Sequence, residues 1–72
     1  MDAIAQEKLE KVLRGELKYT STNLAFNMLI TKMQRKLKSE PQSMEACMKE
    51  IDTFFSKYPI VAKVDLANIA AL

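Results

Sequence analysis

Apolar residues recur at helical spacing along most of the chain. The first set predicts a helix over residues 3–14 with Gly15 as its C-cap. Alternatively, residues 16–18 extend the helix through this glycine at a cost of roughly 1 kcal/mol. A cluster of short polar side chains at residues 20–23 then favours a turn and an N-cap, so we expect a second helix over residues 23–38. The apolar positions are Ala5, Leu9, Val12 and Leu13 in the first helix and Phe26, Leu29, Ile30, Met33 and Leu37 in the second.

A third amphipathic segment follows Pro41. This proline disfavours helical geometry at Glu40 and is tolerated in the first turn of a helix, so the helix should begin between residues 41 and 43. Pro59 should end it in the same way at Tyr58. Its apolar positions span an arc of about 120°. They are Met44, Cys47, Met48, Ile51, Phe54, Phe55 and Tyr58.

Residues 60–64 are apolar without helical periodicity when they are read together with the tail, which predicts an extended connector packed on the bundle. Asp65 is a suitable N-cap for a short helix from Leu66 that buries Leu66 and Ile69. The sequence therefore predicts an all-α fold: a small bundle of three main helices plus a short C-terminal helix, in a single domain over residues 1–72.

The segment from Asp65 to Leu72 resembles the first helix of many helix-turn-helix domains. In those domains a small residue at the position of Ala70 allows two helices to cross closely. The resemblance covers eight residues and includes no turn or recognition helix, so it supplies no residue that would read a DNA groove and assigns no family.

The amino-acid composition of the chain excludes most kinds of catalytic site. The 72-residue chain has one glycine, one cysteine and no histidine. It therefore lacks the residues of a phosphate loop, a dinucleotide fingerprint, a Cys/His zinc finger, a serine triad or an internal disulfide. The carboxylates fall on predicted solvent faces beside lysines. We expect a protein that is not an enzyme, with no catalytic, cofactor-binding or metal-binding residue and no small-molecule substrate.

A chain of this size has a marginal core, because it buries only about 60% of its surface on folding. Without disulfides or a metal, such a fold can be stabilised by regular helix packing or by association with a second chain. The acidic start of the chain does not have the pattern of a signal peptide, and no apolar run approaches the roughly 20 residues of a spanning helix. We expect a cytoplasmic, reducing location and no membrane contact.

Basic residues concentrate in the middle of the chain, where no acid occurs between Glu16 and Glu40. Clustered cations on a helix can neutralise phosphates, which would make the chain a nucleic-acid-binding or regulatory protein. The simpler alternative is a solvated helix end whose cations are favoured by the helix dipole, since this face has no aromatic residue for base stacking. The four candidate residues for nucleic acid are Lys32, Arg35, Lys36 and Lys38.

Leu24 and Met28 lie out of register with the core stripe of the second helix, on consecutive turns beside Lys32 and Arg35. Two such residues flanked by cations are typical of an interface core with a charged rim. Alternatively, they pack under the first helix or the C-terminal tail. We favour a partner interface formed by Leu24, Met28, Lys32 and Arg35. The expected function is a small non-enzymatic helical protein–protein interaction module, either a homodimer or an accessory subunit.

The sulfur-containing residues are expected mainly in the core. Met33, Met44 and Met48 lie on apolar stripes, where flexible thioethers fill gaps. Cys47 lies in the first turns of the third predicted helix, where the dipole favours a thiolate, but its place on the apolar stripe predicts a buried small hydrophobe instead.

Overall fold

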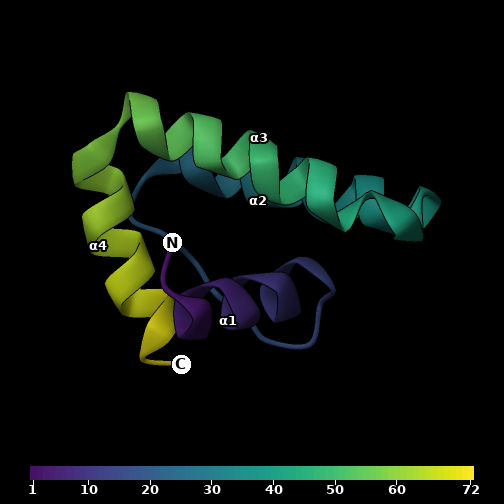
Figure 1. The fold of residues 1–72 in the computed structure, drawn as a ribbon, viewed down its shortest axis with the longest axis horizontal. Helices are drawn as coiled ribbons and strands as arrows, with labels where there is room; N and C mark the ends of the chain where they lie inside the picture. The colour runs from purple at the N-terminus through teal and green to yellow at the C-terminus, as the bar shows by residue number, and fades with distance from the viewer.

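Four α-helices and one short 3-10 helix make up the fold, and no strand is present. The computed structural model describes all 72 residues (Figure 1). The elements in chain order are α1 (Ala3–Leu13), α2 (Leu24–Ser39), η1 (Pro41–Ser43), α3 (Met44–Lys57) and α4 (Pro59–Ala70). The predicted all-α fold and small helical bundle are confirmed. None of the four helices combines the length and the apolar character that crossing a bilayer requires.

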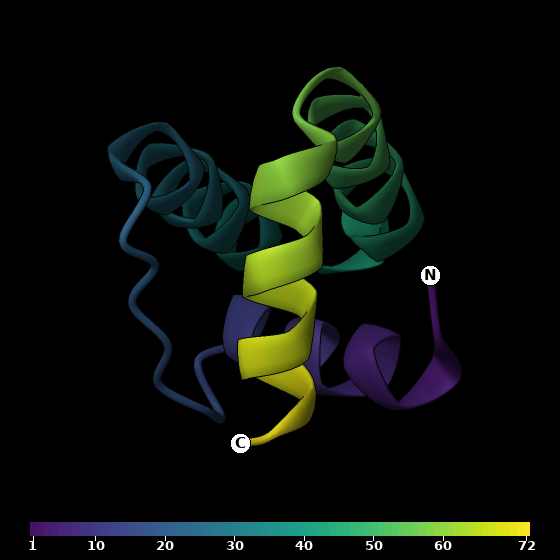
Figure 2. The ribbon, with the colours of Figure 1, turned by 90° about the vertical axis from the view of Figure 1, so that its left-hand side faces the viewer.

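The helices form two layers that α4 joins. In Figure 1, α2 and α3 lie side by side and run in opposite directions, connected by η1, while α1 lies on the other side of the core. From the end of α3, α4 runs across to α1 and contacts both helices. Figure 2 shows α4 along its whole length in front of the other helices. This arrangement leaves one long side of α4 without a covering helix.

Short polar side chains and one glycine set the ends of α1 and α2. Asp2 Oδ1 accepts a hydrogen bond from the backbone N–H of Ile4 at 2.7 Å, and Asn23 Oδ1 accepts one from Phe26 at 3.0 Å. Both are N-caps, which satisfy backbone donors that the first turn leaves free. Gly15 follows α1 with a φ of +80°, a conformation that costs glycine little, so its predicted role at the end of the helix is confirmed.

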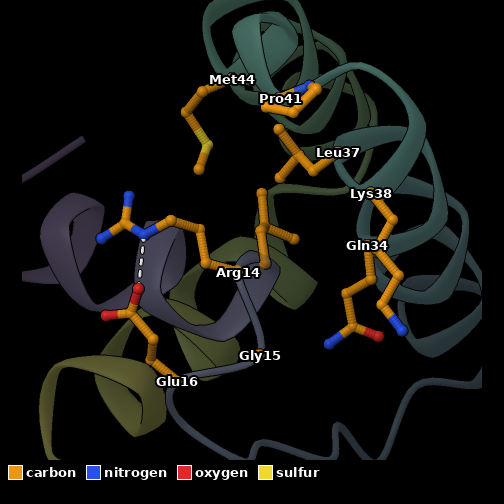
Figure 3. A pocket seen from close by; sticks show the side chains of 9 residues that line it. Arg14, Gly15, Glu16, Gln34, Leu37, Lys38, Pro41 and Met44 are labelled. Carbon is orange, nitrogen blue, oxygen red and sulfur yellow. Dashed lines mark hydrogen bonds and ion pairs between the residues drawn. The ribbon is translucent and has the colours of Figure 1, made fainter.

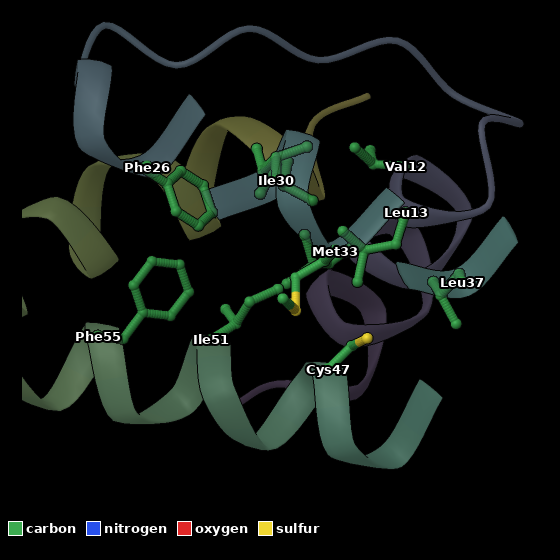
Figure 4. Close-up of a cluster of buried hydrophobic side chains, with 11 residues drawn as sticks. Val12, Leu13, Phe26, Ile30, Met33, Leu37, Cys47, Ile51 and Phe55 are labelled. Atoms are coloured by element: carbon green, nitrogen blue, oxygen red, sulfur yellow. The ribbon is translucent and has the colours of Figure 1, made fainter. Parts of the chain in front are cut away.

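The core lies where the inner sides of all four helices meet (Figure 4). Aromatic rings gather at one end of the core. The centroid of the Phe26 ring lies 5.7 Å from that of Phe54 and 5.0 Å from that of Phe55. Met33 and Cys47 are fully buried, as predicted, whereas Met44 and Met48 are half-buried at the edge of the core. The buried cluster consists of Leu9, Val12, Leu13, Phe26, Ile30, Met33, Leu37, Cys47, Ile51, Phe55 and Ile69.

The extended connector predicted for residues 60–64 is wrong, because these residues form the first turns of α4. Pro59 ends α3 at Tyr58 and also starts α4, since the first helical position needs no backbone N–H. Tyr58 therefore lies between the helices and is half-exposed, not part of a buried stripe. Asp65 is not an N-cap either: it is buried in the middle of α4. The segment that resembles a separate helix-turn-helix element is thus the second half of a longer helix.

Candidate interaction surfaces

Leu24 and Met28 lie on the outer side of α2, facing away from the core. Their exposed fractions are 74% and 65%. The alternative that they pack under α1 or under the C-terminal tail is therefore wrong. Both residues line one shallow hollow together with Lys32 and Arg35, so the structure brings the four predicted interface residues together. We call these four residues, Leu24, Met28, Lys32 and Arg35, the α2 ridge.

The cations of the α2 ridge differ in their surroundings. The Nζ of Lys32 is 3.2 Å from Oε2 of Glu50 on α3, and both side chains are well exposed. A solvent-exposed pair of this kind adds little stability, but it directs the Lys32 side chain towards α3. Arg35 has no carboxylate within ion-pair distance. The charged rim around Leu24 and Met28 therefore consists of Lys32, which is paired with Glu50, and the unpaired guanidinium of Arg35.

The basic residues proposed for nucleic acid do not form one continuous track. Lys36 and Lys38 point about 160° apart around α2, as their spacing of two residues on a helix dictates. Lys36 is half-buried and Lys32 is paired with Glu50, whereas Arg35 and Lys38 are exposed and unpaired. Two of the four cations are thus freely available to a phosphate backbone.

A hollow of about 570 Å³ opens between the end of α1, the second half of α2 and Pro41 (Figure 3). Arg14 Nε lies 2.8 Å from Oε2 of Glu16, and this hydrogen bond raises the pKa of the guanidinium. On the other side, Gln34 Nε2 donates to the backbone oxygen of Val12 at 3.0 Å. Because these polar groups already bond within the protein, the hollow offers few free groups that would fix the orientation of a ligand.

The outer side of α4 is apolar along its whole length. Ile60 and Val64 have exposed fractions of 74% and 47%, and Ala67 and Ala71 are exposed beyond them. At about 100° per residue these four residues fall within about 60° around the helix. We call Ile60, Val64, Ala67 and Ala71 the α4 outer face. Lys63 is the only charged residue among the exposed positions of α4.

The inner side of α4 carries the carboxylate of the helix. Asp65 is only 2% exposed, and its Oδ1 accepts a hydrogen bond from the hydroxyl of Tyr19 in the segment between α1 and α2. Partial burial and then the hydrogen bond to Asp65 raise the pKa of Tyr19 to about 12. No buried side-chain nitrogen or oxygen lacks a partner. The inner side of α4 therefore combines a buried acid with buried apolar side chains such as Ile69, while Ile60 and Val64 lie outside.

Sequence reasoning missed the α4 outer face, because it assigned residues 60–64 to an extended connector. No helical period is visible there, since the outer positions of α4 are as apolar as the inner ones. The signal that would have found the surface is the spacing of Ile60, Val64, Ala67 and Ala71, which repeats in steps of four, three and four.

Cys47 is fully buried and free, with its sulfur 3.7 Å from the hydroxyl of Ser43. No group of three or more acidic, cysteine or histidine side chains is placed to hold a metal ion.

Comparisons of the chain with protein-family models, with curated proteins and with solved structures find no match.

Proposed function

We propose that this chain is a small, non-enzymatic, cytoplasmic interaction module that acts by docking against another protein chain, as a homodimer or an accessory subunit. The exposed apolar side of α4 is the observation that carries this proposal. A helix that is apolar on all sides is normally buried on all sides. Here Ile60 and Val64 face water while Asp65 is enclosed. A partner that covers the α4 outer face would gain about 25 cal/mol for each Å² of apolar surface removed from water.

The α2 ridge supports the same proposal as a second contact surface. Leu24 and Met28 are more than half exposed on consecutive turns, and Arg35 beside them is unpaired. Methionine adapts its shape to a partner, and arginine is enriched at protein interfaces. The α4 outer face has four apolar positions and no charge among them, so we place the main contact there and the lesser one at the α2 ridge.

Site-specific photo-crosslinking tests this function in a native cell extract. A benzophenone amino acid replaces Val64 on the α4 outer face, Met28 on the α2 ridge or, as the control, Thr53, an exposed residue of α3. We expect a protein adduct of defined mass from Val64, a weaker one from Met28 and none from Thr53. Equal background at the three positions would contradict the proposal.

The alternative is a nucleic-acid-binding or regulatory protein that uses Lys32, Arg35, Lys36 and Lys38. It predicts binding to duplex or single-stranded nucleic acid that weakens steeply with salt. The ion pair of Lys32 and the half-burial of Lys36 favour the protein-docking proposal over this one. A flat fluorescence-anisotropy titration at low salt would eliminate the alternative, whereas tight, salt-sensitive binding would replace our preferred function.

A further inference from the structure

We infer that the partner of the α4 outer face is a second copy of this chain, and that two α4 helices pair antiparallel about a two-fold axis. This pairing rests on the proposed function, because it names the partner of the surface proposed there.

The first support is the spacing of the exposed apolar residues. Ile60, Val64, Ala67 and Ala71 follow one another in steps of four, three and four residues. The two seam positions of a coiled coil alternate in the same steps of three and four residues. They repeat every 3.5 residues on average, and this spacing keeps one narrow apolar stripe facing one partner helix. Lys63 and Asn68, both exposed, flank the stripe as a polar rim. The pattern therefore suits a single docked helix.

The second support is the order of side-chain size along the stripe. The two branched residues, Ile60 and Val64, lie in the first half of α4, and the two alanines follow them. An antiparallel two-fold axis between Val64 and Ala67 sets every large residue against a small one. Ile60 then lies against Ala71 of the partner subunit, and Val64 against Ala67 of the partner subunit. The stripe is therefore complementary to itself, as a two-fold symmetric interface requires.

Parallel pairing does not have this property. It sets the two Ile60 side chains against each other at one end and the two Ala71 side chains at the other. The helices would then be held apart at the isoleucine end and leave unfilled space at the alanine end, and close packing excludes such gaps. The order of sizes thus selects the antiparallel arrangement over the parallel one.

The surroundings of α4 leave room for this partner and hold the helix in place. Figure 2 shows no other helix in front of α4 along its length. On its inner side, the hydrogen bond from Tyr19 to Asp65 fixes the middle of α4, and Lys8 Nζ donates to the backbone oxygen of Ala70 at 2.8 Å near its end. A helix held from behind at two points presents a preformed stripe, which lowers the ordering cost of docking.

The size of the contact sets the strength that we expect. α4 has 12 residues and is therefore about 18 Å long. One face of a helix of this length gives an interface below the standard size of about 1,600 Å², so we expect a reversible dimer with a dissociation constant on the order of 10 to 100 µM. The protein should change from monomer to dimer as its concentration is raised through this range.

Disulfide trapping tests the pairing and its direction. Two single-cysteine proteins, Ile60→Cys and Ala71→Cys, are made in a Cys47→Ala background, given tags of different size and mixed under mild oxidation. In the antiparallel dimer, position 60 of one chain lies beside position 71 of the other, whereas the two copies of position 60 are about 16 Å apart along the axis. Disulfide formation needs β-carbons about 4 Å apart. We expect the mixed disulfide in about tenfold excess over either symmetric one.

The trapping experiment does not depend on the Cys47→Ala substitution. If Cys47→Ala prevents folding, the native Cys47 is kept, because it is fully buried and out of reach of the new cysteines. A predominant Ile60→Cys symmetric disulfide would show parallel pairing and overturn the inference. Random disulfides in equal amounts would overturn it as well.

Sedimentation equilibrium gives an independent readout and separates the inference from the proposed function. We expect Val64→Glu to weaken self-association at least about 30-fold, because it places a charge in the centre of the seam, and Thr53→Glu to leave it unchanged. A protein that stays monomeric to millimolar concentration would overturn self-pairing. If the crosslinker at Val64 then captures a different protein, the interaction function survives without the dimer; if it captures none, both fail.

Discussion

The hydroxyl of Tyr19 donates a hydrogen bond to Oδ1 of Asp65, 46 residues further along the chain. This contact joins the segment between α1 and α2 to the inner side of α4. Asp65 lies on the same side of α4 as Ile69, which is fully buried, so this rotation of the helix buries a carboxylate together with apolar side chains. By giving the buried carboxylate a donor, Tyr19 stabilises the rotation that leaves the α4 outer face exposed.

Removing this donor should destabilise the protein. In Tyr19→Phe the carboxylate of Asp65 stays buried without its hydrogen bond, and an unsatisfied buried group costs about 1–3 kcal/mol. Urea unfolding followed by circular dichroism measures the change. Tyr58→Phe is the matched control, because the Tyr58 ring is half-exposed and its hydroxyl makes no hydrogen bond in the structure; we expect a change within about 0.5 kcal/mol. Equal stability of the two variants would show that the Tyr19 hydroxyl does not support Asp65.

The same contact predicts a loss of stability in alkali. Burial and the bond to Asp65 raise the pKa of Tyr19 to about 12, from 10.0 for an unperturbed tyrosine. The folded protein therefore keeps this proton to a higher pH than the unfolded chain does. The resulting stabilisation is fully present below pH 10 and is lost as the pH rises towards 12.

Tyrosinate absorbance checks this shift directly. The chain has two tyrosines, so in Tyr58→Phe the whole signal comes from Tyr19. We expect its titration midpoint to lie well above 10 in the folded protein and to return to about 10 in urea. In parallel, the fall in the urea midpoint between pH 10 and 11 should be smaller for Tyr19→Phe than for the wild type. A midpoint near 10 in the folded protein would contradict the contact.

The sequence predicted the first three helices well because their cues are local. Asn23 as an N-cap, Gly15 after α1 and the prolines at 41 and 59 act within a few residues of themselves. The inner positions of these helices also alternate with polar outer ones, so their buried stripes could be located. The cue at Pro59 was interpreted only in part. It was expected to end α3, but it also begins α4, because one proline can both end one helix and begin the next.

The candidate surfaces were predictable only where they broke a visible pattern. Leu24 and Met28 stand out because the other exposed side chains of α2, apart from Ala25, are polar. In α4 both sides are apolar, so the pattern could not separate the inside from the outside. The side that faces inwards is set by contacts distant in sequence, which include the packing of Ile69 in the core and the hydrogen bond of Asp65 with Tyr19.

The turn after α1 provides a test of backbone strain alone. Gly15 has a φ of +80°, and a β-carbon added to it would meet no atom within 4 Å. Gly15→Ala should therefore lose about 1 kcal/mol through its unfavourable backbone conformation and not through a clash. Gly15→Asn should lose less, because asparagine tolerates this conformation better. Urea unfolding of both variants checks the order, and a larger loss for asparagine would contradict the strain explanation.

Cys47 should be chemically silent in the folded protein. Its side chain is fully buried between α3 and the rest of the core, so a thiol reagent can reach it only after the structure opens. We expect very slow labelling by a thiol reagent under native conditions and fast labelling in urea. A destabilising substitution elsewhere, such as Gly15→Ala, should accelerate the native-state labelling. Fast labelling that is insensitive to Gly15→Ala would show that Cys47 is accessible without opening of the core.

The α2 ridge can be removed without harming the fold, which makes its role separable from that of α4. Leu24 and Met28 are exposed, and Leu24 occupies the first turn of α2, where an acidic side chain is favoured by the helix dipole. The double variant Leu24→Asp, Met28→Asp should therefore keep its stability within about 0.5 kcal/mol. We expect it to bind its partner about tenfold more weakly, whereas Ala46→Asp, Thr53→Asp, which adds the same charge to α3, binds normally. If the Leu24 and Met28 variant folds, keeps its oligomeric state and retains full partner binding, the α2 ridge is not a contact surface and docking occurs through α4 alone.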